Sequence, residues 1–356
     1  MPIRATIDTA ALRHNLHRVR ELAPGALVMA VVKANAYGHG LEAAVRALEG
    51  ADGVAVARVD EGLALRAAGR TGRILLLEGA FDAVQLAAAV GAGLDLMVNG
   101  PEQLRMLEER AGDGRVRVWL KIDTGMNRLG FRPEEFGEVH ALLRRIPGVE
   151  PDPVLATHLA SAEDAADPKT AGQLAAFEGA TAGVAGARSI ANSAGVLAWP
   201  AARGGWVRPG LMLYGLSPFP EGSGADFGLR AVMSFETRVI AVRTVKPGET
   251  VGYGGTWCAA RESRVAVVAA GYGDGYPRGA RAGTPVLVGG RSAPLAGRVS
   301  MDMLTVDVTD LPAVSVGESV ELWGRALPVE EVARCARTIP YELTCAVSQR
   351  VRRESR

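Results

Sequence analysis

The chain has few cysteines, few aromatic residues and no excess of charge of either sign, and each shortage excludes a class of protein. Its three cysteines (Cys258, Cys335 and Cys345) lie far apart and form no CxxC pair, which argues against a disulfide framework and a metal site. A reducing, cytoplasmic setting is therefore expected. The 40 Lys and Arg residues balance 39 Asp and Glu residues, so nothing indicates a nucleic-acid partner.

Long hydrophobic runs are also missing. No apolar run approaches the roughly 18 residues needed to cross a bilayer, and the N-terminal residues lack the pattern of a signal peptide. We therefore expect a globular protein with no membrane partner. At 356 residues, the chain is long enough for two domains.

Residues 1–225 alternate between short, β-branched, apolar runs and longer runs with the period of an amphipathic helix. Eight strands separated by such helices predict a closed (β/α)8 barrel of the TIM type. An open, doubly wound sheet is the competing topology, but the GxGxxG turn that usually follows its first strand is absent. The expected strands span residues 27–32, 53–57, 74–77, 94–98, 116–122, 154–157, 189–191 and 211–213.

The pattern changes near residue 220, where the segment SPFPEGSG (217–224) predicts a linker. Residues 226–356 contain short strand-like segments between Gly or Pro turns, with one late helix near 329–336. The fold class predicted is therefore α/β, with an N-terminal barrel and a C-terminal, mostly β domain.

Several polar residues lie at the ends of the predicted barrel strands, where barrel enzymes carry their active sites. Lys33 ends an apolar run, and burial there would make its amine a usable nucleophile or Schiff-base former. An ordinary lysine whose amine reaches water is the alternative. The other residues at strand ends are Tyr37, Arg128, His158, Ser193 and Arg208, the last of which precedes the expected eighth strand.

Two glycine-flanked segments offer the donors that a phosphate group requires. The segments ANSAG (191–195) and RPG (208–210) supply hydroxyl and backbone N–H groups, although each could be an ordinary turn. A reactive lysine, a phosphate cradle and an arginine in one barrel mouth together indicate pyridoxal 5'-phosphate, held as a Schiff base on Lys33.

Nine segments, between about residues 4 and 351, resemble in order and approximate spacing those of the bacterial alanine racemases that use pyridoxal phosphate. They are AVVKANAYGHG (30–40), KIDTGMNRLGF (121–131), THLASAED (157–164), ANSAG (191–195), VRPGLMLYGL (207–216), VGYGGTW (251–257), GYGDGYPR (271–278), GRVSMD (297–302) and IPYELTC (339–345). The resemblance implies a homodimer with shared active sites, which interconverts L-alanine and D-alanine and supplies D-alanine for peptidoglycan.

The resemblance also implies a role for each matching residue. Lys33 would act on one face of the substrate Cα, and Tyr253, from the second subunit, on the other. The implied cofactor contacts are Lys33, Tyr37, Arg128, His158, Ser193, Arg208, Gly210, Leu211 and Tyr341. The substrate carboxylate would meet Arg128 and Met301, and the entrance would be formed by Tyr272, Arg298 and Tyr341. In relatives the lysine that matches Lys121 is carbamylated and braces the arginine that matches Arg128.

These roles agree with the chemistry of a racemase. Two bases on opposite faces can remove a proton from Cα and return one without rotating the intermediate. Arg208 stays protonated, so it cannot donate its proton to a pyridine nitrogen as an acid would, and the ring becomes a weaker electron sink. Gly205, where many relatives carry Asp, is a departure that touches no proposed catalytic group.

Three other functions remain open. One is a racemase of broader specificity that acts on serine as well as alanine. A second is an amino-acid decarboxylase of related fold, although that group usually places an acidic residue, and not an arginine, at the pyridine nitrogen. The third is a cofactor-binding protein without activity, whose single-domain relatives lack the β domain that carries Tyr253 and Met301.

Overall fold

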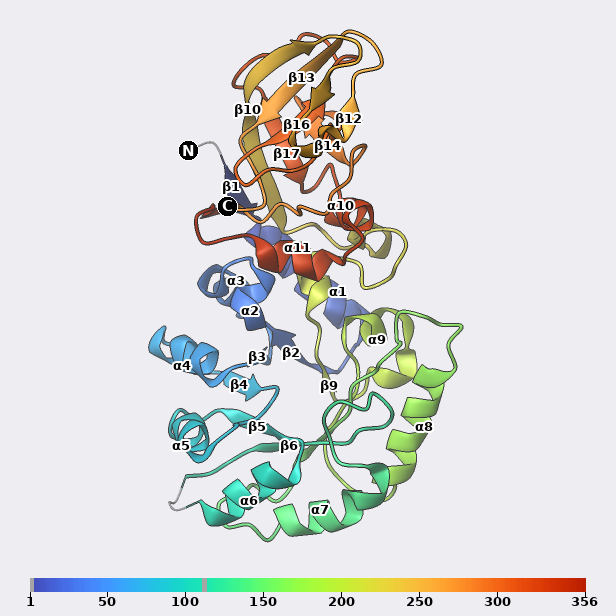
Figure 1. Cartoon of the computed structure of the whole chain (residues 1–356). Coiled ribbons are helices and arrows are strands. Elements are labelled where there is room, and N and C mark those ends of the chain that lie inside the picture. Colours follow the sequence, from blue (N-terminus) through green and yellow to red (C-terminus); the bar gives the residue numbers. More distant parts are fainter. Residues whose placement is uncertain (1–2, 111–113) are drawn as a thin grey trace.

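The computed structural model describes residues 3–110 and 114–356; positions 1, 2 and 111–113 of the predicted first domain lie outside the described residues. Figure 1 shows a barrel joined to a mostly β domain, with helices α10 and α11 between them. Eight parallel strands follow one another around the barrel, and the last pairs with the first, which confirms the predicted TIM-type barrel. These strands are β2 (Leu27–Val31), β3 (Gly53–Val56), β4 (Arg73–Leu76), β5 (Asp95–Val98), β6 (Val118–Lys121), β7 (Val154–Ala156), β8 (Arg188–Ser189) and β9 (Trp206–Val207).

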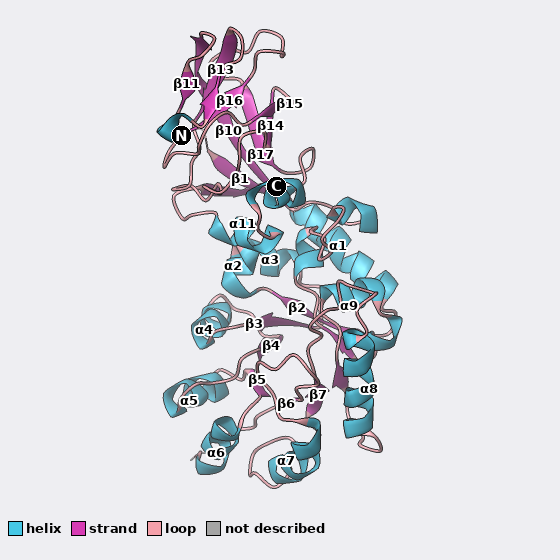
Figure 2. Cartoon of the chain, turned by 45° about the vertical axis from the view of Figure 1, so that its right-hand side comes forward, coloured by secondary structure: helices cyan, strands magenta, loops and turns pink. Residues whose placement is uncertain are grey.

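Helices surround the strands, as Figure 2 shows for α4 to α8. Helix α5 illustrates why they form: Asp82 caps it by accepting from the Gln85 N–H at 2.7 Å, and Leu86 and Ala89 bury its inner face. No helix in the described ranges is long and apolar enough to cross a membrane. The α-helices of this part are α1 (Thr9–Leu22), α2 (Lys33–Tyr37), α3 (Leu41–Ala47), α4 (Val59–Ala67), α5 (Ala83–Gly91), α6 (Pro101–Glu109), α7 (Phe136–Leu143), α8 (Lys169–Thr181) and α9 (Ser193–Ala198).

The expected eighth strand at 211–213 is wrong. Leu211–Tyr214 forms a 3-10 helix, η3, and the eighth strand is the two-residue β9 that precedes it. A short apolar run such as LMLY does not distinguish strand from helix, and a two-residue strand leaves almost no pattern. Arg208 therefore directly follows the carboxyl end of β9, on the same rim as the other predicted site residues.

The second domain is built on an eight-stranded sheet. One of its members is β1 (Arg4–Ile7), which pairs with β10 and with β18, so the start of the predicted first domain lies outside the barrel. The boundary between residues 225 and 226 stays a prediction. The other strands are β10 (Met233–Val245), β13 (Ser263–Val268), β14 (Pro285–Val288), β15 (Arg291–Pro294), β16 (Leu304–Asp307), β17 (Ser319–Trp323) and β18 (Arg352–Ser355), and β11 (Thr250–Val251) pairs with β12 (Trp257–Cys258) apart from them.

The segment predicted as a linker is tied to the second domain. The buried carboxylate of Glu330 accepts from the N–H groups of Ser217 at 2.8 Å and Gly224 at 3.0 Å. Glu330 belongs to α10 (Val329–Ala336), which is followed by α11 (Pro340–Ala346). Helix α11 packs against α2 at the barrel mouth, so both helices can complete a site there.

The opposite end of the barrel is filled by side chains. Asp95, at the start of β5, accepts from Trp119 Nε1 at 3.1 Å and from Arg73 Nη1 at 3.2 Å. The guanidinium of Arg73 also lies over the ring of Trp206, 5.3 Å from its centroid. This packing leaves the carboxyl ends of the strands as the open end of the barrel.

Candidate active site

A cavity of about 1040 Å³ lies at the carboxyl ends of the barrel strands and extends to α10 and α11. The structure brings ten of the predicted site residues to its wall. They are Lys33, Tyr37, Lys121, Arg128, His158, Ser193, Arg208, Gly210, Leu211 and Tyr341. This convergence of lysine, arginine and hydroxyl side chains makes the cavity the candidate active site.

Lys33 opens a turn of unusual handedness. The next four residues, Ala34–Tyr37, have φ between 52° and 55°, so α2 is a left-handed turn. A left-handed conformation costs a non-glycine residue roughly 1–2 kcal/mol. Gly38 continues the left-handed path, and a Cβ atom on it would lie 1.9 Å from the Thr344 carbonyl oxygen of α11. Such a turn persists only where its surroundings hold it, and strain of this kind is concentrated at functional sites.

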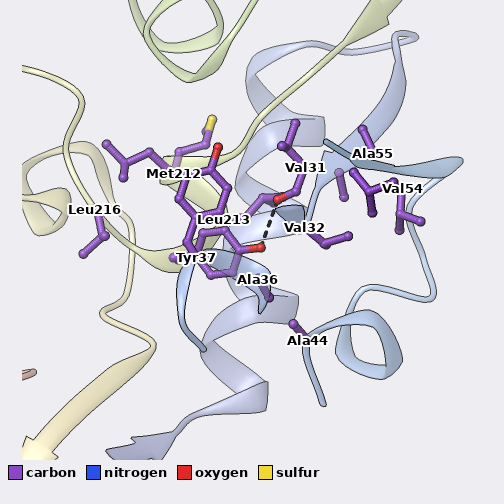
Figure 3. Close-up of a cluster of buried hydrophobic side chains, with 14 of the residues drawn as sticks. Val31, Val32, Ala36, Tyr37, Ala44, Val54, Ala55, Met212, Leu213 and Leu216 are labelled. Atoms are coloured by element: carbon purple, nitrogen blue, oxygen red, sulfur yellow. Dashed lines mark hydrogen bonds between the residues drawn. The ribbon is translucent and has the colours of Figure 1, made fainter. Parts of the chain in front are cut away.

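Three aromatic rings pack behind the left-handed turn. His39 stacks on Tyr214 with ring centroids 4.5 Å apart, and Tyr214 lies 5.0 Å from Tyr37. The hydroxyl of Tyr214 donates to the Val31 carbonyl at 2.9 Å, which ties the row to β2. Figure 3 shows Tyr37 in this apolar cluster, close to Ala36 and Leu213. The cluster fixes Tyr37 with its hydroxyl toward the cavity wall.

The hydroxyl groups of Ser193 and Tyr37 lie on either side of Gly210 and form a cradle of hydrogen-bond donors. The Ser193 hydroxyl oxygen accepts from the N–H groups of Gly210 at 3.0 Å and Met212 at 3.2 Å, which leaves its own proton to donate. Burial raises the pKa of Tyr37, so its hydroxyl remains a neutral donor. Burial also raises the pKa of Tyr341 to about 12. The cradle suits the oxygens of a bound phosphate group.

Arg208 is a buried cation held by neutral groups. Its guanidinium donates to Ser189 Oγ at 2.5 Å and to the Thr157 carbonyl at 2.6 Å, and it approaches His158 Nδ1 at 3.4 Å. Burial lowers the pKa of Arg208 to about 10, which still leaves it charged at neutral pH. Burial, together with Arg208 and the other nearby cations, holds the pKa of His158 well below its usual range. His158 therefore accepts from Arg208 as a neutral ring.

Lys121 ends β6 among cations. Burial, followed by the charges of Arg208 and Arg128, lowers the pKa of its amine to about 8. Arg128 lies on the next loop, which folds around Asp123: the carboxylate accepts from the N–H groups of Gly125, Asn127 and Arg128 at 3.0–3.1 Å. Burial opposes the charge on Asp123, but these N–H groups prevail and hold its pKa below the usual value.

Two residues that shape the site were not predicted. Asp123 builds the loop that carries Arg128, and an Asp followed two residues later by Gly, directly after a strand, was a signal for such a turn. Gln173, buried on α8, donates to the His158 carbonyl at 3.0 Å and accepts from the Ala160 N–H at 2.8 Å. It fixes the loop after β7, and no local pattern in the sequence marks it.

The remaining four predicted site residues lie apart from the cavity, on one edge of the second domain that we call the outer edge (Tyr253, Tyr272, Arg298 and Met301). Tyr253 is 69 % exposed and Met301 53 % exposed. The Tyr272 N–H donates to the Ser300 carbonyl at 3.0 Å, beside Met301. A Cβ atom on Gly254 would lie 3.4 Å from Arg298, which places the Tyr253 turn against the same loop.

The fold and this mouth define a class of protein, namely a barrel enzyme with a lysine-centred, cationic site and a β domain beside the mouth. Residues 7–218 match the model of the alanine racemase N-terminal domain, and residues 232–355 match that of the C-terminal domain. The chain belongs to the alanine racemase family, whose members are isomerases.

Individual relatives agree over nearly the full length. The alanine racemase of Shewanella baltica is 51 % identical, with 98 % of this chain and 97 % of the relative covered. That of Nitrosococcus oceani is 52 % identical, with 98 % of both covered. The crystal structure of a biosynthetic alanine racemase from Pseudomonas aeruginosa superimposes with a TM-score of 0.97 at 49 % identity, with 100 % of this chain and 99 % of that chain covered. These matches support alanine racemisation as the activity.

Proposed function

We propose that the protein interconverts L-alanine and D-alanine with pyridoxal 5'-phosphate bound at the barrel mouth. The proposal rests on one observation: Lys33, the donor cradle and the buried Arg208 line the same cavity. The residues fit the cofactor, because a Cβ on Gly210 would lie 2.5 Å from the Tyr37 hydroxyl, so only glycine leaves room for the cradle. The chemistry that pyridoxal phosphate supplies when bound is electron withdrawal, which makes the substrate's Cα proton acidic.

Different residues of the cavity would bind different parts of the cofactor and the substrate. Five would hold the phosphate: Tyr37, Ser193, Gly210, Leu211 and Tyr341. Arg208 would face the pyridine nitrogen, with His158 supporting both Arg208 and the ring. Arg128 would approach the phenolic oxygen of the cofactor and the carboxylate of the substrate, so that charge orients the amino acid before proton transfer.

Proton transfer would use two bases. On one face of Cα, the Nζ of Lys33 takes the proton in one direction of reaction and gives one in the other. On the opposite face the same exchange is made by Tyr253 of the partner subunit. One base takes a proton from Cα and the other base returns one to the opposite face. The configuration at Cα is therefore inverted without net change in composition.

The exposure of the outer edge supports a shared site in a homodimer. Tyr253 and Met301 are exposed and do not line the cavity of their own chain, whereas a second copy could present them to the mouth. In that dimer Met301 would offer its N–H to the substrate carboxylate. Tyr272, Arg298 and Tyr341 would frame an entrance whose size favours alanine.

A mixing experiment tests both the two bases and their origin. Lys33→Ala and Tyr253→Phe proteins are each expected to be inactive, and reassembly of an equal mixture should restore about a quarter of the wild-type activity, because half of the dimers carry one intact site. If both bases came from one chain, no mixture would regain activity. Retention of the cofactor's lysine-bound absorbance by Lys33→Ala would overturn the whole proposal.

We propose further that Lys121 is carbamylated. An amine with a pKa of about 8 is partly neutral near neutral pH and can react with carbon dioxide. The amine nitrogen forms a bond to the carbon of carbon dioxide and releases one proton to solvent. The product is a carbamate anion, which Arg208 and Arg128 would stabilise and which would hold Arg128 by a charge-assisted hydrogen bond.

Two alternative activities are open to direct test. Chiral analysis of products from L-alanine and L-serine distinguishes a strict racemase from a serine/alanine racemase, and release of carbon dioxide would reveal a decarboxylase. The buried Arg208, in place of an acid, disfavours the decarboxylase. Because the Pseudomonas aeruginosa relative is biosynthetic, we propose that the product serves peptidoglycan synthesis in the cytoplasm.

A further inference from the structure

The left-handed turn after Lys33 is held by groups from two distant parts of the chain and by His39, which directly follows the turn. Glu61, on α4, accepts from the Ala34 N–H at 2.6 Å. His39 donates from Nδ1 to the carbonyls of Ala36 at 3.0 Å and Tyr37 at 2.9 Å. Arg353, on β18, donates to the Gly38 carbonyl at 2.8 Å. The contact of Glu61 lies closest to Lys33, because it holds the peptide group that directly follows it.

Glu61 accepts a backbone hydrogen bond just beyond the point where the hydrogen bonds between β2 and β3 end. The Val32 N–H still donates to the Ala55 carbonyl of β3 at 2.8 Å, and two residues later the backbone turns left-handed. The Ala34 N–H then no longer faces a neighbouring strand. Ala34 is exposed at this point, and a carboxylate oxygen of Glu61 supplies the acceptor for its N–H group.

The second oxygen of Glu61 anchors the carboxylate to the adjacent strand end. It accepts from the N–H groups of Ala57 at 2.9 Å and Arg58 at 3.1 Å, directly after β3. One carboxylate therefore bridges the peptide that follows Lys33 and the loop that begins α4. Both partners are backbone groups, so the bridge sets the course of the backbone and leaves the Lys33 amine free.

We propose that Glu61 is a positioning residue: its carboxylate fixes the peptide between Lys33 and Ala34 and so aims the Lys33 side chain into the cavity. The inference rests on the proposed role of Lys33 as the cofactor lysine. A shift of about 1 Å in a reacting group can reduce a rate by about 100-fold. We therefore expect the loss of this bridge to lower kcat more than it changes substrate binding.

The test compares Glu61→Ala and Glu61→Gln with Asp60→Asn in the full-length protein. Asp60 is exposed on the same first turn of α4, so its variant removes one charge from the same helix N-terminus without touching the Lys33 turn. The first readout is covalent trapping of Lys33 by pyridoxal phosphate and borohydride, followed by mass spectrometry. The second is hydrogen exchange at the Ala34 amide, and the third is the division of any loss between kcat and KM.

For Glu61→Ala we expect Lys33 trapping to slow by about 10-fold to about 100-fold, kcat to fall in parallel, and KM for alanine to change little. Exchange of the Ala34 amide should quicken, while Asp60→Asn matches the wild type. Glu61→Gln keeps the side-chain volume and one acceptor oxygen, so it should fold and give a smaller effect in the same direction.

Two outcomes would overturn the inference. One is wild-type trapping and kcat in both Glu61 variants. The other is a lower melting temperature with unchanged trapping by the folded protein, which would make Glu61 a stability residue only. The proposed function fails differently: in that case Lys33 of the wild-type protein would not be trapped at all.

Discussion

The hydroxyl of Tyr37 lies against the backbone of Gly210, so close that a Cβ atom on Gly210 would be 2.5 Å from the hydroxyl oxygen and 3.1 Å from the ring carbon that bears it. The two residues come from the turn after β2 and from the start of η3. Their contact joins the lysine-bearing turn to the donor cradle, and a single methyl group would separate them.

We therefore expect Gly210→Ala to push Tyr37 away and to weaken pyridoxal phosphate binding by about 1–3 kcal/mol, the usual cost of overpacking. Absorbance titration of the protein stripped of cofactor measures this. Gly204→Ala is the matched control, because a Cβ there meets nothing within 4 Å. In a Tyr37→Phe background the effect of Gly210→Ala should shrink; an undiminished effect would show that the hydroxyl is not the obstacle.

Modification of Lys121 should depend on pH. Because its pKa is lowered to about 8, the neutral amine that reacts with carbon dioxide becomes more abundant as the pH rises from about 7 to about 9. Protein equilibrated with ¹³C-bicarbonate should show a carbamate carbon resonance that grows over this range and is missing in Lys121→Arg. A resonance that persists in Lys121→Arg would assign the modification to another lysine.

His39 should make the fold sensitive to acid. Burial lowers its pKa from 6.5 to about 4, so between these values the unfolded chain binds a proton that the folded chain does not. The free energy of unfolding should therefore fall as the pH drops from 6.5 to 4, by roughly 3 kcal/mol from this residue. His39→Asn can keep a donor toward the turn but does not titrate, so its denaturant midpoint should vary less with pH. Equal slopes in both proteins would contradict this assignment.

Asp123 should control substrate affinity through the loop that carries Arg128. Replacing it with Asn removes a charged acceptor of three N–H groups, which we expect to raise KM for alanine by about 10-fold and to lower stability by about 1–3 kcal/mol. Steady-state kinetics and thermal melting measure the two effects. Asp152→Asn, at an exposed site, serves as the control. A stability loss without a change in KM would separate the loop from substrate binding.

Much of the fold followed from periodicity. The expected strands at 27–32 and 53–57 correspond to β2 and β3, and the expected helix at 329–336 coincides with α10. The eighth strand was misplaced because β9 has two residues and is specified by its neighbours in the closed barrel, which no local pattern records. The placement of β1 in the sheet of the second domain was not predicted for the same reason, because its partner strands are more than 200 residues away in the chain.

Local properties of residue type were enough to propose which residues would carry the chemistry: an apolar run that ends in Lys33, glycine-flanked donors and an arginine that stays charged. The orientation of Lys33, in contrast, depends on contacts between segments that are far apart in the chain. Its left-handed turn is held by Glu61, 27 positions away from Ala34, and by Arg353, 315 positions away from Gly38. A left-handed turn of non-glycine residues is sterically unfavourable, so it persists only where other parts of the fold hold it. No short stretch of sequence contains these distant partners.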